Sequence, residues 1–249
     1  MVTTRKPKAA TSAHAFDEPT TLTKKLPKLK IEHLKRVDPL TDNQSSAFHA
    51  YHKDRNLILS GSAGTGKTFL SMYLALREVL EGKSPYKKVV IIRSIVPTRD
   101  IGFLPGDEQE KKEVYMLPYI DICTELFGEK NAFERLFENG QIEFLTTSFI
   151  RGTTLNNCVI ILDEMQNCVF RELDTVITRV GNNARFIMCG DYYQSDFDKD
   201  KDKQGIVGFM KIVEAMNSFH HVEFKWADIV RSDFVRDYIV TKETLKISS

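Results

Sequence analysis

"GSAGTGKT" occupies residues 61–68 and directly follows a short apolar stretch, "NLILS" (56–60). It fits the Gly-x-x-x-x-Gly-Lys-Ser/Thr pattern of a phosphate-binding loop, or P-loop. The glycines let the backbone curl until successive N–H groups point at one anion. "TFLSMYLALREVL" (68–80) predicts a helix whose positive dipole end faces the same point. A flexible linker would not pass from a buried strand straight into an amphipathic helix, so the stretch indicates a nucleotide phosphate site.

The residues of the P-loop have distinct expected roles. Lys67 would reach the β- and γ-phosphates, and the hydroxyl of Thr68 would ligate Mg²⁺. The sequence therefore predicts a nucleoside triphosphate and Mg²⁺ as cofactors. The residues expected to contact the nucleotide here are Gly61, Ser62, Ala63, Gly64, Thr65, Gly66, Lys67, Thr68 and Phe69.

A second stretch, "VIILDEMQN" (159–167), supplies the acidic partner that a P-loop requires. Four apolar residues predict a buried strand, and Asp163 emerges at its carboxyl end, where α/β proteins bind ligands. Asp163 would hold Mg²⁺ directly or through water, and Glu164 is placed to polarise an attacking water. The alternative is that this acidic pair only opens the following loop or helix.

A third stretch, "MCGDYYQSD" (188–196), ends another apolar strand. Gln194 could hydrogen-bond the γ-phosphate or the attacking water and so sense hydrolysis. This requires the strand to lie beside the P-loop strand, which the fold class predicts. Alternatively, the stretch is a turn with an outward-packing aromatic pair.

The chain as a whole predicts one three-layer α/β domain with a mainly parallel sheet. Thr41 or Asp42 would cap a helix ahead of the first strand. The charged stretch 196–205 is expected to be a solvated loop. Strands are expected at 56–60, 88–94, 141–147, 157–164, 184–190 and 221–226, and later helices at 110–127, 170–180 and 205–218.

Composition sets the class of protein. Of the 249 residues, 42% are hydrophobic and 28% charged, as in globular proteins. No apolar run approaches the roughly 18 residues of a membrane span, and no signal-peptide-like stretch begins the chain, so we expect a cytoplasmic protein with no membrane partner. The scattered cysteines lack zinc-ligand spacing and are expected to be reduced and buried: Cys123, Cys158, Cys168 and Cys189.

The N-terminal region differs from the rest in charge. Residues 1–36 carry nine Lys or Arg and three Asp or Glu, a net +6, which leaves −5 for the remainder. We interpret residues 1–37 as a basic, disordered or extended arm, and residues 38–249 as the ATPase domain. The arm could contact a nucleic-acid backbone or could simply solubilise the chain.

Five stretches together closely resemble the PhoH family, in a compact form of the type found in phages. The resemblance extends over residues 40–240, and "GFLPG" (102–106) is its most distinctive part. It implies an ATP-hydrolysing domain like the first RecA-like domain of superfamily 1 helicases, which acts on RNA or other nucleic acid as a ring, expected to be a hexamer. RNA is favoured over DNA. The stretches are "GSAGTGKT", "IVPTRDIGFLPGDEQEK", "TTSFIRGTTLNNCVIILDEMQN", "CGDYYQSD" and "ADIVRSDFVRDY".

The resemblance also implies roles for single residues. Gln44 is similar to the glutamine that reads adenine in helicases, although it could be a surface residue. Arg231 resembles the arginine that helicase-like ATPases bring to the γ-phosphate, in cis or in trans, although it could ion-pair with Asp228 or Asp233. With Lys67, Glu164 and Gln194 it completes the expected catalytic set. Arg151 matches a family position of structural or nucleotide-linked role.

The chain departs from full helicases in having no room for a second RecA-like domain, and none for the RNA-cleaving PIN domain of some family members. A neighbouring copy would have to complete the site. Arg93, Thr98 and Arg99 lie where helicase relatives contact nucleic-acid phosphates, or form a solvated loop.

Three other functions remain open. A thymidine-kinase-like enzyme shares the P-loop and the "DE-x-Q" pattern, but its structural zinc needs paired cysteines, which this chain lacks. A non-hydrolysing, ATP-gated scaffold would keep the same binding residues. A ring ATPase that remodels proteins would have the same nucleotide site.

Overall fold

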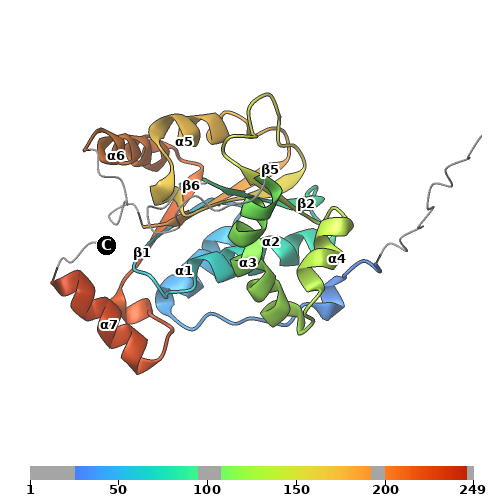
Figure 1. Cartoon of the computed structure of the whole chain (residues 1–249), viewed down its shortest axis with the longest axis horizontal. Coiled ribbons are helices and arrows are strands. Elements are labelled where there is room, and N and C mark those ends of the chain that lie inside the picture. The colour runs from blue at the N-terminus through green and yellow to red at the C-terminus, as the bar shows by residue number, and fades with distance from the viewer. Residues whose placement is uncertain (1–25, 95–107, 192–199, 246–249) are drawn as a thin grey trace, which may run out of the picture.

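In a computed structural model of the protein, residues 26–94, 108–191 and 200–245 are described, with only the backbone of 108–112 and 200–204. Within these residues, one parallel sheet has the strand order β3-β2-β4-β5-β1-β6 (Figure 1). The expected α/β class with a mainly parallel sheet is confirmed. The strands are β1 (Asn56–Gly61), β2 (Lys88–Arg93), β3 (Ile142–Thr146), β4 (Cys158–Asp163), β5 (Ala184–Gly190) and β6 (Phe219–Phe224).

The order of the strands positions the site. β5 lies between the P-loop strand β1 and the acidic strand β4. The expectation that strand 184–190 neighbours the P-loop strand is therefore confirmed. Because all three strands run in parallel, their carboxyl ends meet at one edge of the sheet, where α/β proteins bind ligands.

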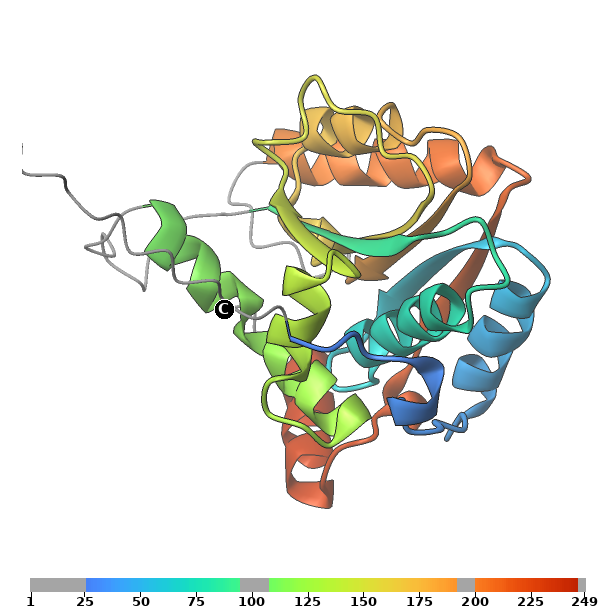
Figure 2. The same cartoon turned by 90° about the vertical axis from the view of Figure 1, so that its right-hand side faces the viewer.

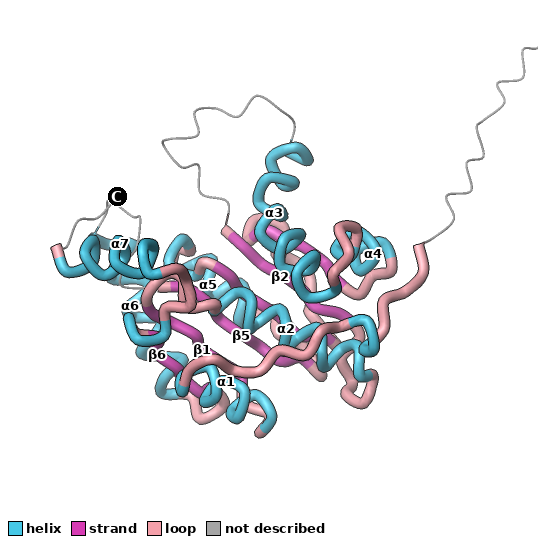
Figure 3. Tube along the Cα trace, turned by 90° about the horizontal axis from the view of Figure 1, so that it is seen from below, coloured by secondary structure: helices cyan, strands magenta, loops and turns pink. Residues whose placement is uncertain are grey.

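Helices cover both faces of the sheet, which confirms the three-layer architecture (Figures 1 and 2). Figure 3 looks onto the face covered by the helices from the N-terminal half of the chain. Each face has its own apolar core, the first including Met72 and Phe133 and the second Leu173 and Phe209. The first layer holds α1 (Asp42–His52), α2 (Lys67–Glu81), α3 (Glu108–Phe127) and α4 (Ala132–Glu138), and the second α5 (Phe170–Ile177) and α6 (Asp200–Ala215).

The structure differs from the expected element pattern in several places. Residues 200–205 belong to α6 and are not part of a solvated loop, because the apolar positions later in α6 pack on the second core and the helix extends back from them. The strand expected at 221–226 begins two residues earlier, at Phe219. Thr41, not Asp42, caps α1 by accepting from the backbone N–H of Gln44. The pattern also missed α4, α7 (Asp233–Thr244) and the short helices η1 (Ile31–His33), η2 (Met165–Asn167) and η3 (Trp226–Asp228).

Part of the segment assigned to the N-terminal arm packs against the domain. Residues 26–37 run beneath the first helical layer, with Leu29 only 1% exposed in its core (Figure 1). The side chain of Gln141 donates to the carbonyl oxygen of Leu29 at 3.1 Å. The packed chain therefore includes residues that the sequence interpretation placed before the domain boundary at 38.

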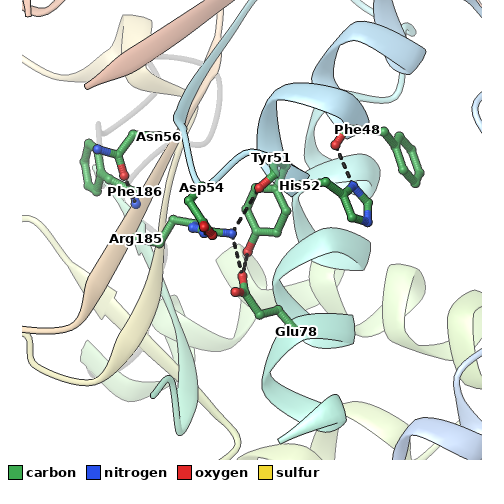
Figure 4. A network of polar contacts seen from close by, with 8 residues as sticks. All are labelled: Phe48, Tyr51, His52, Asp54, Asn56, Glu78, Arg185 and Phe186. Carbon is green, nitrogen blue, oxygen red and sulfur yellow. Dashed lines mark hydrogen bonds and ion pairs between the residues drawn. The ribbon is translucent and has the colours of Figure 1, made fainter. Parts of the chain in front are cut away.

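A buried polar network ties β5 to the first helical layer (Figure 4). The guanidinium of Arg185 donates to Glu78 at 2.9 Å, pairs with Asp54 and lies 4.4 Å from the ring centroid of Tyr51. Tyr51 donates its hydroxyl to Glu78 as well. Burial lowers the pKa of Arg185, but Tyr51, Glu78 and Tyr86 raise it by more. This network lies at the amino ends of the strands, away from the P-loop, and so has a structural role.

The cysteines and the helix lengths bear on two expectations drawn from composition. All four cysteines are buried and free, as expected of reduced core thiols. In the described part of the chain, no helix combines the length and apolarity needed to cross a bilayer.

Candidate nucleotide-binding site

The P-loop links β1 to α2 in a conformation that requires glycine. Gly61 has φ +111°, and a Cβ there would stand 2.0 Å from the carbonyl oxygen of Phe224 on the neighbouring strand. Gly66 caps α2 in the left-handed region, with φ 81°. Larger side chains at these two positions would clash or be strained. The P-loop therefore requires glycine at both positions, and it leads directly into the amino end of α2.

Lys67 is folded onto the loop that precedes it. Its Nζ donates to the carbonyl oxygens of Gly61 (2.6 Å) and Ser62 (2.8 Å). Burial lowers the pKa of Lys67, while nearby Cys189, Asp191 and other carboxylates oppose that effect. The ammonium thus lies among the loop carbonyls, within the region where phosphates would approach the helix.

Thr68, at the start of α2, contacts Asp163 at the carboxyl edge of the sheet. The Oγ1 of Thr68 donates to Oδ1 of Asp163 at 2.9 Å, although the residues are 95 positions apart. Asp163 is 3% exposed at the carboxyl end of β4. A hydroxyl and a carboxylate beside a phosphate-binding loop are the oxygen ligands that Mg²⁺ uses together with nucleotide phosphates. The residues present therefore fit the expected Mg²⁺ site.

Two further side chains surround the Asp163 carboxylate. The hydroxyl of Tyr119, from α3, donates to Oδ2 at 2.8 Å. Arg93, at the end of β2, is the direct register partner of Asp163. Burial raises the pKa of Asp163, and Glu164 raises it further, whereas hydrogen bonds from Tyr119 and Thr68 and the charge of Arg93 lower it. Burial lowers the pKa of Arg93, but Tyr119 and the two carboxylates raise it by more.

Glu164 adopts an unusual backbone conformation directly after β4. Its φ of 51° and ψ of 48° lie in the left-handed region, which is rare for residues other than glycine. Gln166 donates its amide N–H to the Glu164 carboxylate. Through its oxygen, Gln166 also accepts from the backbone N–H of Asp191 at 3.0 Å. Gln166 therefore links the proposed base to the end of β5.

Gln44 connects α1 to the P-loop. Its amide nitrogen donates to the carbonyl oxygen of Thr65 at 3.2 Å, and its amide oxygen accepts from the backbone N–H of Leu40 at 2.8 Å. At 7% exposure it is not the surface residue that the sequence left open.

Arg231 lies beside the P-loop of its own chain. The neighbouring Val230 donates its backbone N–H to the carbonyl oxygen of Gly64 at 3.0 Å, and Cγ of Arg231 would be 3.0 Å from a Cβ at Gly64. The carboxylate of Asp228, one candidate ion-pair partner, instead accepts from Asn43 at 2.7 Å and from the backbone of Lys225 at 2.8 Å. The segment after β6 therefore brings Arg231 to the edge of the nucleotide site.

Several candidate residues are not located by the structure. Gln194, Thr98, Arg99 and the stretch 102–106 lie outside the described residues. Arg151 is exposed in a turn after β3.

Sequence reasoning missed two residues of this site. Tyr119 lies in the middle of a helix, and no local pattern indicates that its hydroxyl meets an aspartate on another strand. Gln166 had a local signal, because it follows Glu164 by two positions in "DEMQN". For Arg93 the sequence left open a nucleic-acid contact or a solvated loop, and the structure pairs it with Asp163 in the sheet register.

Comparisons with known proteins agree with the motif pattern. A family profile described as PhoH-like protein matches residues 36–242. The PhoH-like protein of Bacillus subtilis (strain 168) is 33% identical over 180 residues, which make up 72% of this chain and 55% of that protein. Protein PhoH2 of the same organism is 37% identical over 171 residues, 66% of this chain and 38% of that protein. The chain therefore spans only about half, or less, of these relatives.

Among solved structures, the chain is similar to the Sulfolobus solfataricus SWI2/SNF2 ATPase core in complex with dsDNA. The TM-score is 0.47 at 12% identity, over 82% of this chain and 49% of that one. This likeness is too distant to bear on function.

The family assignment rests on the profile match and on curated relatives that share most of this chain. The P-loop and the acidic pair 163–164, which carried the resemblance in the sequence, lie together at the carboxyl edge of the sheet. The chain belongs to the PhoH family.

Proposed function

We propose that this chain is a Mg²⁺-dependent ATPase. One observation carries the proposal: Thr68 of the P-loop and Asp163 of β4 are in contact, with their oxygens 2.9 Å apart. Two oxygen ligands beside a P-loop at the amino end of a helix suit a metal-bound nucleoside triphosphate. When bound, Mg²⁺ would neutralise charge that develops on the phosphates during transfer.

In this proposal each side chain has one task. Lys67 exchanges its contacts with the loop carbonyls for the β- and γ-phosphates, and Thr68 and Asp163 hold the metal. Glu164 accepts a proton from the attacking water and so acts as the general base. The amide of Gln166 donates to Glu164 and limits its rotation.

Three residues would act on the two ends of the nucleotide. Gln194 would hydrogen-bond the γ-phosphate or the attacking water, and Arg231 would neutralise charge at the γ-phosphate. The position of Arg231 beside Gly64 of its own chain supports a role in cis. Gln44 would steady the P-loop, and would read adenine by exchanging one of its two backbone contacts for the base.

Family membership supports a proposal for the partners of this chain. We infer a cytoplasmic homo-oligomeric ring, a hexamer in the family expectation, which couples hydrolysis to binding or remodelling of nucleic acid, with RNA favoured over DNA. The net charge of +6 on residues 1–36 supports a polyanionic partner.

Steady-state ATP hydrolysis by the purified chain tests this function, measured alone and with single-stranded RNA or DNA. Glu164→Gln is the blank, and it should turn over at least ~100-fold more slowly than the unmodified chain. Stimulation by one polymer supports the nucleic-acid role. Hydrolysis that neither polymer changes would favour a protein-remodelling ATPase, and hydrolysis no faster than the blank would favour an ATP-gated scaffold.

A further inference from the structure

The Asp163 carboxylate is held from two sides by different elements. Thr68 donates to Oδ1 from the P-loop helix at 2.9 Å, and Tyr119 donates to Oδ2 from α3 at 2.8 Å. Only the first of these contacts belongs to the nucleotide motifs. Tyr119 is fully buried, at 0% exposure, so its hydroxyl makes this contact inside the first core.

Burial and Asp163 raise the pKa of the Tyr119 hydroxyl, and the nearby Arg93 opposes them. A phenol has one O–H to donate and can accept in return. The single hydroxyl proton of Tyr119 is directed to Asp163. A guanidinium can only donate, so Arg93 does not compete for that proton. The ring centroid of Tyr115, one turn earlier on α3, lies 5.6 Å from the Arg93 guanidinium.

An aspartate carboxylate rotates easily about its last side-chain bond, because that torsion has a broad minimum. One hydrogen bond to Oδ1 leaves this rotation free, and a second bond to Oδ2 restricts it. Residues that hydrogen-bond to a metal-binding side chain orient it in this way. Their loss typically weakens metal affinity or activity by about 10–100-fold.

We propose that Tyr119, with Arg93 beside the same carboxylate, is a positioning residue that turns Oδ1 of Asp163 toward Thr68 and the Mg²⁺ of a bound nucleotide. The proposal rests on the function proposed above, since it takes Asp163 as a metal-binding residue. It assigns Arg93 to the nucleotide site, where the sequence suggested a nucleic-acid contact.

The test is the Mg²⁺ dependence of nucleotide binding in Tyr119→Phe, which removes a single hydroxyl. A fluorescent, non-hydrolysable ATP analogue is titrated in EDTA and then at increasing free Mg²⁺. We expect affinity in EDTA to stay within about twofold of the unmodified chain, because the P-loop contacts do not change. The half-saturating Mg²⁺ concentration should rise by about 10–100-fold. A purely structural role would weaken binding equally with and without the metal.

Tyr73→Phe is the matched control. Tyr73 is also buried, at 3% exposure, and packs on Phe48 in the same core. The half-saturating Mg²⁺ concentration of Tyr73→Phe should match that of the unmodified chain. Circular dichroism checks the fold of each variant. Arg93→Lys is a second test, because it keeps the positive charge but loses the planar donor group. We expect it to raise the half-saturating Mg²⁺ concentration by at least about threefold.

The outcomes distinguish failure of this inference from failure of the proposed ATPase function. An unmodified chain that binds no analogue would refute the proposed function. If Mg²⁺ enhances binding of the analogue to the unmodified chain, but the half-saturating Mg²⁺ concentration of Tyr119→Phe is unchanged, the inference is overturned and the proposed function stands. If Tyr119→Phe does not fold, an unchanged half-saturating Mg²⁺ concentration in Arg93→Lys overturns the inference.

Discussion

Replacing Glu164 with glycine should leave the protein more stable than replacing it with alanine. Glu164 has φ 51° and ψ 48°, in the left-handed region. A residue with a Cβ pays about 1–2 kcal/mol to adopt that conformation. Glycine avoids this cost but loses about 0.5–1 kcal/mol through the greater freedom of its unfolded chain. The difference leaves Glu164→Gly more stable than Glu164→Ala by about 0.75 kcal/mol, the midpoint of a range of about 0–1.5 kcal/mol.

Comparing the two variants isolates the free-energy cost of the left-handed backbone conformation at residue 164. Both remove the same carboxylate beside Asp163, so the change in charge cancels between them. Lys211 provides the matched control, because it is exposed in the interior of α6 in ordinary helical conformation. There the order should reverse, with glycine less stable than alanine by about 1 kcal/mol.

The assay is equilibrium unfolding in urea, followed by circular dichroism in EDTA without nucleotide. Turnover of ATP is measured in parallel and should fall at least ~100-fold in both Glu164 variants. If glycine is the less stable residue at 164, as it should be at 211, the left-handed conformation stores no strain and the reasoning is refuted. Agreement would show that the proposed base is held in a costly backbone conformation, as functional residues often are.

Three further predictions address other parts of the molecule. Lys67→Ala should abolish nucleotide binding, as measured with the fluorescent ATP analogue, and near-normal affinity would remove the P-loop assignment. Arg185→Met should cost about 3 kcal/mol in urea unfolding, because it leaves the partly buried Glu78, at 19% exposure, without its cation. Arg77→Met breaks a partly exposed pair and should cost no more than about 0.5 kcal/mol, and equal losses would contradict the buried-network interpretation. Burial raises the pKa of Cys158 to about 11 and of Cys123 to about 12, so at pH 8 the thiols should react with Ellman's reagent only after unfolding. Rapid labelling of the folded chain would show that the cores open readily.

The parts of the site that the sequence predicted are local in the chain. The P-loop needs a strand, a glycine turn and a helix in immediate succession, and residues 56–81 contain all three. The acidic pair 163–164 was recognised because the end of an apolar strand marks the ligand-binding edge of a parallel sheet. Short-range order of this kind depends on backbone conformation and burial, which neighbouring residues largely determine.

The parts that the sequence did not predict depend on pairing between distant elements. Arg93 lies opposite Asp163 only because β2 pairs with β4 in one register. Tyr119 reaches the same carboxylate across 44 positions because of the way α3 packs on the first core. Neither contact leaves a periodic signal in the chain.

The sequence by itself therefore determined the fold class, the phosphate-binding loop and the acidic residues beside it, because glycine geometry and apolar strands act over a few neighbouring residues. Only the tertiary structure decided what surrounds the Asp163 carboxylate and where residues 26–37 pack. Strand register and helix packing are set by the whole core at once, since each buried side chain must fit partners that lie far away in the chain.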